Sequence, residues 1–249
     1  MKNKTTTDSP RILLYDIETA PNLSYTWEKW ETNVIEHNRD WYMLSFAYKW
    51  LGEDKVHAHS LHEFHGYKKD MENDHMLIQK LWDLFNEADI IIAHNGDEFD
   101  IKKTNARFLI HGMLPPKQYK TIDTKKVAKS NFKFDSNSLN DLGKQLGVGV
   151  KMDTGGFATW KGCMTGDKKS WERMVKYNKV DVELLEAVYM KLRPWIKNFP
   201  ITHVFDGSCY HCGSIHLQNR GTTVTRTATY KRHQCQDCGA WLKGDKVKE

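Results

Sequence analysis

Two kinds of hydrophobic pattern alternate along most of the chain. Residues 11–18 (RILLYDIE), 41–50 and 55–61 are rich in aromatic and β-branched residues and are bounded by turn formers, which predicts strands. Residues 89–93 (DIIIA) form a short continuous apolar run, typical of a strand buried on both faces. A further short strand is predicted at 119–123.

Segments with helical periodicity lie between these strands. Asp74 is the expected N-cap of a helix whose apolar residues recur at Ile78, Leu81, Trp82, Phe85 and Ala88. Further helices are predicted at 99–111, 125–129 and 138–146, and a long one at 170–193. Strands that alternate with helices after an early meander indicate an α/β domain with a mixed sheet.

Composition narrows the class of protein. Of the 249 residues, 39% are hydrophobic and 28% charged, which suits a folded domain with a real core. No apolar run approaches the roughly 18–20 residues that cross a bilayer, and the N-terminal residues lack the apolar stretch of a secretory signal. We therefore expect no membrane partner and a cytoplasmic location, in the host cytoplasm if the source is viral.

Cysteines are concentrated near the C-terminus. Four of the five form two pairs, Cys209-x-x-Cys212 and Cys235-x-x-Cys238, and each pair is followed by glycine. In a chain without a secretion signal this spacing favours a metal over disulfides. A structural, tetrahedral Zn²⁺ site made of four thiolates is the prediction.

Acidic residues occupy positions that are costly without a counter-charge. Asp16 and Glu18 are two apart near the end of a largely apolar strand, so both project from the same face. Asp181 and Tyr177 share the apolar face of the long helix, and Asp100 opens the helix after the buried strand. Like charges on a buried face repel unless a cation lies between them, and hard oxygen ligands suit Mg²⁺ or Mn²⁺.

Three motifs in order resemble a known family. The segments YDIET at 15–19, HNG…FD at 94–100 and Tyr177-x-x-x-Asp181 are similar to the three exonuclease motifs of the DEDD, DnaQ-like 3′–5′ exonucleases. The third has the form of the tyrosine subclass, as in the proofreading domains of family B DNA polymerases. The resemblance covers about residues 11–193 and implies a ribonuclease H-like fold, a mixed sheet flanked by helices. A whole polymerase is not expected at this length.

The resemblance also implies the roles of individual residues. Asp16, Glu18, Asp100 and Asp181 would hold two Mg²⁺ or Mn²⁺ ions, and Tyr177 would orient the attacking water. Asn95 would approach the substrate strand. His94 and Glu98 are interpreted as structural or solvated.

A second nucleic-acid contact is expected in the C-terminal region. From His203 onward, seven Lys or Arg residues stand against four Asp or Glu, a mildly basic balance that fits nucleic acid as a partner. Residues 222–232 (TTVTRTATYKR) alternate like one arm of a hairpin, which would put Arg226, Tyr230 and Arg232 on one face. That arrangement suits base stacking with phosphate contacts, although a solvated hairpin face would have the same pattern.

The combined prediction is a metal-dependent 3′–5′ exonuclease acting on a single-stranded 3′ end, DNA favoured over RNA. A structure-selective endonuclease on the same fold, or an inactive zinc-ribbon protein that binds nucleic acid, are the alternatives. Protein partners are not indicated. The predicted divisions are a disordered N-terminus (1–10), an exonuclease domain (11–195) with a glycine-rich mobile loop (149–168), a linker (196–204), a zinc ribbon (205–243) and a tail (244–249).

Overall fold

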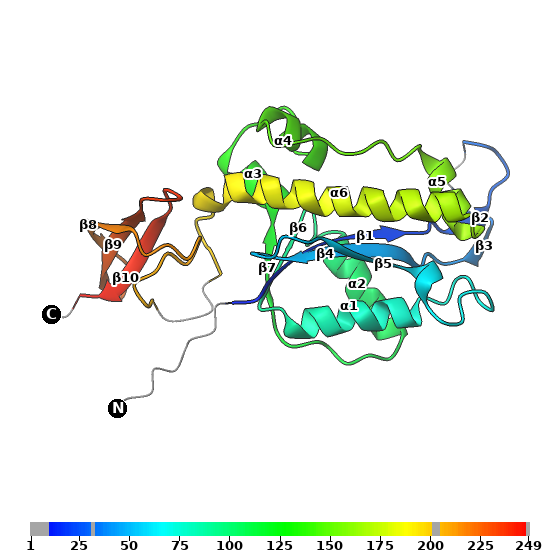
Figure 1. The fold of residues 1–249 in the computed structure, drawn as a ribbon, viewed down its shortest axis with the longest axis horizontal. Helices are drawn as coiled ribbons and strands as arrows, with labels where there is room; N and C mark the ends of the chain where they lie inside the picture. Colours follow the sequence, from blue (N-terminus) through cyan, green and yellow to red (C-terminus); the bar gives the residue numbers. More distant parts are fainter. Residues whose placement is uncertain (1–9, 31–32, 201–204, 248–249) are drawn as a thin grey trace.

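A five-stranded mixed sheet forms the centre of the protein (Figure 1). This computed structural model describes residues 10–30, 33–200 and 205–247, so the predicted disordered N-terminus lies, apart from Pro10, outside the described residues. β1 is antiparallel to β4 and parallel to β6, and β6 is parallel to β7. The predicted α/β fold with a mixed sheet is confirmed. In the order β5-β4-β1-β6-β7, the strands are β5 (His57–Ser60), β4 (Met43–Trp50), β1 (Ile12–Thr19), β6 (Ile90–Ala93) and β7 (Lys120–Asp123).

Helices cover both faces of the sheet (Figure 1). α1 (His75–Glu87) and α2 (Asp100–Ile110) lie on one face, and the long α6 (Lys168–Leu192) crosses the other. The remaining elements of this part of the chain are α3 (Thr124–Asn131), α4 (Leu139–Gln145), α5 (Phe157–Met164), the 3₁₀ turns η1 (Leu61–Glu63) and η2 (Arg193–Trp195), and a small hairpin of β2 (Leu23–Tyr25) and β3 (Glu36–Arg39). Among the described residues, no helix is both long and apolar enough to cross a bilayer.

Side chains alternate along β1 between two cores. Leu13, Tyr15 and Ile17 are buried in a core that includes residues of α1 and α2. Leu14 is buried in the other core, with the apolar face of α6. Because successive residues of a strand point to opposite faces, Asp16 lies on the α6 side of the sheet. Strand parity thus decides which helix the acidic side chains meet.

The prediction that the glycine-rich segment 149–168 is a mobile loop is wrong, because this segment contains α5 and the first residue of α6. α5 packs on the long helix, and Cys163 is completely buried in the same core as Trp171. Gly162 permits this close approach, since a Cβ there would lie 2.0 Å from the Oγ of Ser170. Close packing, rather than mobility, explains this glycine.

The chain ends in a small sheet that we call the cysteine module (residues 205–247). Its strands are β8 (Leu217–Val224), β9 (Thr229–Cys235) and β10 (Trp241–Lys246), in the order β10-β9-β8. The predicted single strand 222–232 is wrong, because a turn at 225–228 divides it between β8 and β9. β10 continues past residue 243 into the predicted tail.

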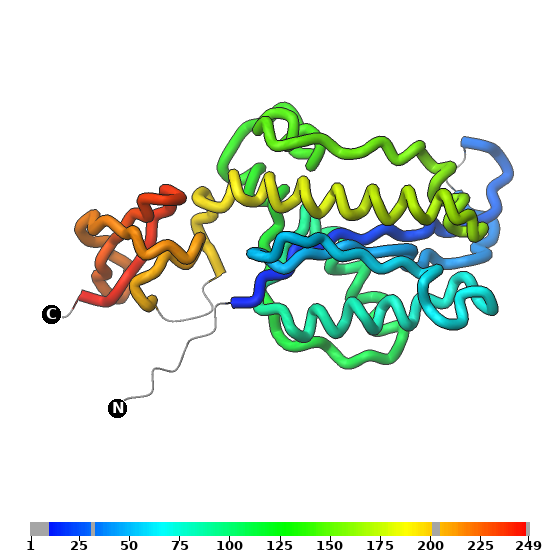
Figure 2. Tube along the Cα trace, in the orientation of Figure 1, coloured from blue at the N-terminus to red at the C-terminus, as the bar shows by residue number. Residues whose placement is uncertain are grey.

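The cysteine module is docked against the C-terminal end of α6 (Figures 1 and 2). His211 is 2% exposed, and its Nδ1 lies 2.9 Å from the carbonyl oxygen of Arg193. The ring of Phe199 lies 4.5 Å from that of His211 and 6.1 Å from that of Tyr210. Within the predicted linker, residues 201–204 lie outside the described part, whereas Phe199 is part of this contact.

Candidate active site

β1 and α6 bring three carboxylates together. Oxygens of Asp16, Glu18 and Asp181 all lie within 4.8 Å of one another. Asp181 is 1% exposed, whereas Asp16 and Glu18 are half-buried, so the group opens toward solvent on the strand side. The sequence prediction that these three acids converge is therefore matched by the geometry.

Asp100 lies beside this group rather than within it. It is the first residue of α2 and is 4% exposed, and its Oδ1 accepts a hydrogen bond from the backbone amide of Ile17 at 3.4 Å. Ile17 lies between the two acids of β1, which ties the start of α2 to that strand. Apart from burial, the negative charge of Asp100 raises the pKa of Asp16 more than any other group does. The fourth predicted acid thus contributes to the same electrostatic field.

Burial and mutual repulsion of these carboxylates favour the binding of a proton or a cation. Burial, followed by the charge of Asp181, raises the pKa of Glu18 to about 8. Burial also raises the pKa of Asp100 to about 7, and burial together with Asp100 raises the pKa of Asp16 well above its usual range. Oδ1 of Asp181 is buried and has no hydrogen-bond partner among the described residues. Unpaired carboxylate oxygens that repel one another are the donor set that a divalent cation satisfies.

Tyr177 lies one helical turn before Asp181 on α6 and is 8% exposed. Burial and then the charge of Asp181 raise the pKa of its phenol far above neutrality. Its hydroxyl therefore stays protonated and can both donate and accept a hydrogen bond beside the acids. The predicted site residues on α6 thus face the predicted site residues on β1.

Lys151 is a residue of this site that the sequence interpretation missed. Its Nζ donates to Oδ2 of Asp181 at 2.6 Å and to the hydroxyl of Tyr177 at 3.1 Å. Burial lowers the pKa of Lys151, but the carboxylates of Asp181, Asp16 and Glu18 together leave the pKa raised. Lys151 belongs to the segment taken as a mobile loop, and no periodicity there pointed to the acids.

Asn178 is the second missed residue. It is fully buried, and its Nδ2 donates to Oδ2 of Asp16 at 2.7 Å, while its Oδ1 accepts from the Ser45 hydroxyl at 3.1 Å. The signal available in the sequence was a polar residue three positions before Asp181 on an otherwise apolar helix face. Asn178 fixes the orientation of Asp16 from the α6 side.

The loop after β6 is shaped by its backbone. Asn95 has a φ of 65°, and its backbone amide donates to Oδ1 of Asp123 at 2.9 Å. A Cβ on Gly96 would lie only 2.4 Å from the Cβ of Ala93, so a side chain there would displace the loop. His94 is held by the hydroxyl of Thr124 at 2.9 Å and by a backbone carbonyl at 3.0 Å, which fits the structural role expected for it. Asn95 itself is half-buried at the end of β6.

The cysteine module gathers all four paired cysteines. Their sulfur atoms lie within 4.8 Å of one another, with Cys209 and Cys238 3.7 Å apart and Cys212 and Cys235 3.5 Å apart. None of the four is in a disulfide bond. Burial raises the pKa of Cys235, but the backbone amides of Cys238 and Asp237, together with hydrogen bonds from the thiols of Cys212 and Cys238, lower it to about 7. Four converging sulfurs with amides directed at a thiolate fit a tetrahedral Zn²⁺ ion.

The predicted basic face of this module is only partly correct. Tyr230 and Arg232 alternate on β9 and share a face, whereas Arg226 lies in the exposed turn between β8 and β9. Arg226 leaves the shared face because the strand is interrupted at residues 225–228.

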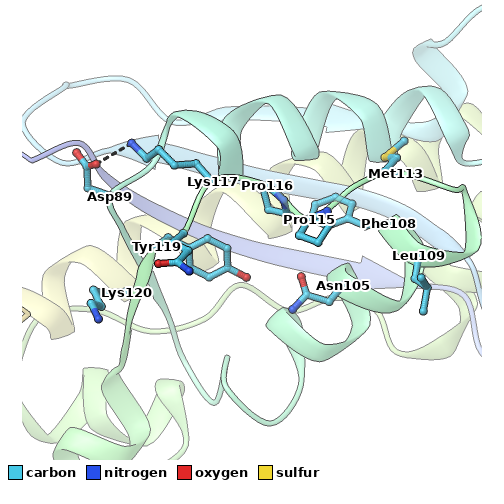
Figure 3. A pocket seen from close by; sticks show the side chains of 11 residues that line it. Asp89, Asn105, Phe108, Leu109, Met113, Pro115, Pro116, Lys117, Tyr119 and Lys120 are labelled. Carbon is cyan, nitrogen blue, oxygen red and sulfur yellow. Dashed lines mark hydrogen bonds and ion pairs between the residues drawn. The ribbon is translucent and has the colours of Figure 1, made fainter.

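A cavity of about 780 Å³ lies between α2 and the segment 113–120 (Figure 3). Its lining combines Pro115 and Pro116 with Phe108 and an ion pair of Lys117 with Asp89. None of the carboxylates described above lines it. Candidate chemistry therefore rests on the acid group and not on the size of this cavity.

Comparisons with known proteins agree with this fold. A solved structure of the family B DNA polymerase from the hyperthermophilic archaeon Pyrobaculum calidifontis superposes with a TM-score of 0.55 at 13% sequence identity. The match covers 90% of this chain and 32% of the polymerase chain, so the protein spans about a third of the polymerase's length. No curated protein matches the sequence. A family model described as RNase_H superfamily matches residues 30–193. With about two thirds of its length matched, the chain belongs to the RNase H superfamily.

Proposed function

We propose that this protein is a metal-dependent 3′–5′ exonuclease that hydrolyses phosphodiester bonds at a single-stranded 3′ end, with DNA favoured over RNA. The observation that carries the proposal is the convergence of Asp16, Glu18 and Asp181 within 4.8 Å, with Asp100 beside them. Membership of the RNase H superfamily and the likeness to a family B DNA polymerase support it.

The donor set fits two divalent cations. Asp16, Glu18 and Asp181 would be direct ligands of the ions, and Asp100 would act through coordinated solvent. Two Mg²⁺ or Mn²⁺ ions supply an activated water and stabilisation of the leaving 3′-oxygen. Cation binding would offset the burial and mutual repulsion that raise the carboxyl pKa values, and it would give Oδ1 of Asp181 a partner.

The remaining side chains orient groups around the acids. The Tyr177 hydroxyl, which stays protonated, would hold the attacking water by a hydrogen bond. The Lys151 ammonium anchors that hydroxyl and offers positive charge to a phosphate oxygen. Asn178 fixes Asp16, and Asn95 at the end of β6 would contact the substrate strand.

We further propose that the cysteine module is a zinc ribbon holding one structural Zn²⁺ and assisting nucleic-acid binding through Arg226, Tyr230 and Arg232. The module is too short to bury a sizeable core, so a metal staple would supply its stability. One zinc per chain by elemental analysis, reduced in Cys235→Ser, is the expected result. Full occupancy in that variant would contradict the assignment.

Nuclease activity is tested with 5′-labelled DNA and RNA oligonucleotides of matched sequence, incubated with Mg²⁺, Mn²⁺ or chelator. Progressive shortening from the 3′ end is expected with either metal and not with chelator. Asp16→Asn should abolish it, whereas Glu183→Gln, an exposed carboxyl on α6, should not. A closed circular substrate separates the alternatives, because only an endonuclease cuts it. Binding without hydrolysis under all conditions would favour an inactive binding protein.

A further inference from the structure

One face of the cysteine module places two cations directly opposite each other. Arg232 on β9 pairs with Lys243 on β10, so both side chains project from the same face of the sheet. Like charges in directly opposite positions destabilise a sheet. Neither side chain forms a salt bridge with a carboxylate among the described residues. An anion between them would remove this repulsion.

Two aromatic side chains share that face. Trp241 lies two residues before Lys243 and is 51% exposed, and the Arg232 guanidinium lies 5.2 Å from its ring centre. The Lys243 ammonium lies 4.6 Å from the ring centre of Tyr230. Cations interleaved with exposed rings are typical of surfaces that contact phosphates and stack bases of a single strand.

A cleft of about 480 Å³ separates this face from the chain segment that follows α6. Its lining includes Arg232, Trp241 and Lys243 of the module together with Lys197 and Phe199 of the segment that follows α6. No carboxylate is among its lining residues. The cleft thus presents three cations and an exposed indole in one place.

The contacts that dock the module also form the cleft. His211 is held by the carbonyl of Arg193, and Phe199 packs against the rings of Tyr210 and His211. The position of Lys197 relative to β10 is therefore set by buried contacts. The cleft combines residues of both parts of the chain.

The cleft is remote from the acid group. Asp181 lies near the middle of α6, and Arg193, where the module docks, follows it by twelve residues, or about 18 Å along a helix. Figure 1 shows the module at the end of α6, away from α5 and the β2–β3 hairpin. A ligand in the cleft does not touch the carboxylates directly.

We propose that this cleft is a second binding site for the single-stranded nucleic acid, with Lys197, Arg232 and Lys243 on its phosphates and a base stacked on Trp241. The inference rests on the proposed nuclease function, because it assumes the same substrate. It adds that the strand is held about 18 Å or more from the bond that is cut. Only substrates long enough to reach both places gain from the cleft.

Binding is measured first, on the full zinc-loaded chain carrying Asp16→Asn so that hydrolysis does not interfere. The probes are a fluorescent long single-stranded DNA, its RNA counterpart and the matching duplex. Arg232→Gln with Lys243→Gln should lower the slope of log affinity against log salt by about 1.4 on the single strands, since each lost phosphate contact contributes about 0.7. Trp241→Ala should weaken binding roughly tenfold.

The matched control is Lys231→Gln, which removes a cation from the opposite face of β9. Zinc content and unfolding temperature show whether each variant is intact, and Lys197→Gln repeats the test outside the module. An equal loss with Lys231→Gln, or unchanged binding in both cleft variants, would overturn the proposal. Equal wild-type affinity for the duplex would overturn its single-strand character, and competition by polyphosphate as strong as by the oligonucleotide would overturn the stacking role.

Turnover then separates this proposal from the nuclease assignment. In the active chain Trp241→Ala should raise KM about tenfold for a long oligonucleotide and leave kcat and trinucleotide hydrolysis unchanged. If the wild type binds through the cleft but hydrolyses nothing, the nuclease proposal fails and the cleft stands. If hydrolysis is normal and KM for the long substrate does not change, the cleft proposal fails alone.

Discussion

Asn178 donates a hydrogen bond from Nδ2 to Oδ2 of Asp16 over 2.7 Å and a second, at 3.2 Å, to the carbonyl oxygen of the same residue. A residue of α6 therefore fixes both the side chain and the backbone of the central acid on β1. The opposite end of the amide accepts from Ser45 on β4, so its orientation is determined by two strands.

Asn178→Asp keeps the shape of this residue but replaces a donor with a further negative charge. We expect hydrolysis to fall roughly 10- to 100-fold, the usual cost of losing a group that orients a metal ligand. Metal titration of the rate is the measurement, because a positioning role changes metal dependence as well as kcat. Ser45→Ala, which removes only the partner on β4, should have a smaller effect. Unchanged metal dependence in N178D would contradict the role.

Lys151→Met removes the cation that occupies Oδ2 of Asp181. Without competition from the ammonium, Mn²⁺ should bind more tightly, as measured by its paramagnetic resonance signal. Hydrolysis should nevertheless fall, by roughly 10- to 100-fold, because the Tyr177 hydroxyl loses its anchor. Lys144→Met, an exposed lysine on α4, controls for the change in net charge. Weaker Mn²⁺ binding in K151M would argue against competition.

Asp74 illustrates a buried ion pair whose loss should affect stability alone. Its carboxylate is fully buried, pairs with Arg107 and His111, and accepts from the amide of Met43 at 2.7 Å. Asp74→Ala leaves Arg107 without its counter-charge and should lower the free energy of unfolding by about 3–5 kcal/mol. Chemical denaturation measures it, with the exposed Asp83→Ala as the control. If Asp74→Ala lowers the free energy of unfolding by less than Asp83→Ala does, the buried ion pair does not stabilise the fold.

His94 should make the folded state sensitive to mild acid. Burial lowers its pKa from its usual 6.5 to about 4, so the unfolded chain binds a proton more readily than the folded one. The neutral His94 ring contributes its full share of the free energy of unfolding above the pKa that it has in the unfolded chain. This share is lost as the pH falls from 6.5 toward 4. Between pH 7 and 5 the wild type should lose about 2 kcal/mol more than His94→Gln. Parallel denaturation curves at both pH values provide the test, and equal losses would contradict burial of the neutral ring.

Removal of zinc should unfold the cysteine module and leave the central sheet intact. A small module without its metal has too little apolar surface to remain folded. Circular dichroism should show loss of the module's strands while a thermal transition of the main sheet persists. Readdition of Zn²⁺ should restore the signal. A single transition that vanishes with the metal would indicate that the two parts fold together.

The hydrophobic pattern predicted the sheet and the long helix because the central strands are nearly continuous apolar runs and the helix has a regularly spaced apolar face. Parity along β1 placed Asp16 and Glu18 on one face, and the helical face of α6 placed Tyr177 and Asp181 toward them. Local patterns sufficed here because each pair of residues belongs to one regular element.

Residues whose role depends on tertiary contacts were not predictable in this way. Lys151 lies before α5 in a segment without periodicity and reaches Asp181 only through folding of the chain. Asp74 does precede α1, as expected of an N-cap, but its side chain forms no capping bond and is used in the buried ion pair instead.

The turn that divides β8 from β9 shows a different failure. Thr225 closes it, with its hydroxyl accepting from the amide of Ala228 at 3.2 Å and its amide donating to the carbonyl of Ala228 at 2.8 Å. No glycine, proline or asparagine marks this turn. Threonines continue the alternating pattern through it, so the pattern predicted a strand where the chain reverses.

β1 is bordered by β4 on one side and β6 on the other, and its apolar residues are completely or almost completely buried. Amide hydrogens in such a strand exchange with solvent only through the largest openings of the fold, whereas segments at the periphery open far more often. The two acids of β1 are thus attached to the part of the molecule that opens last. Their spacing persists while outer segments fluctuate, so ligands can enter and leave without disturbing it.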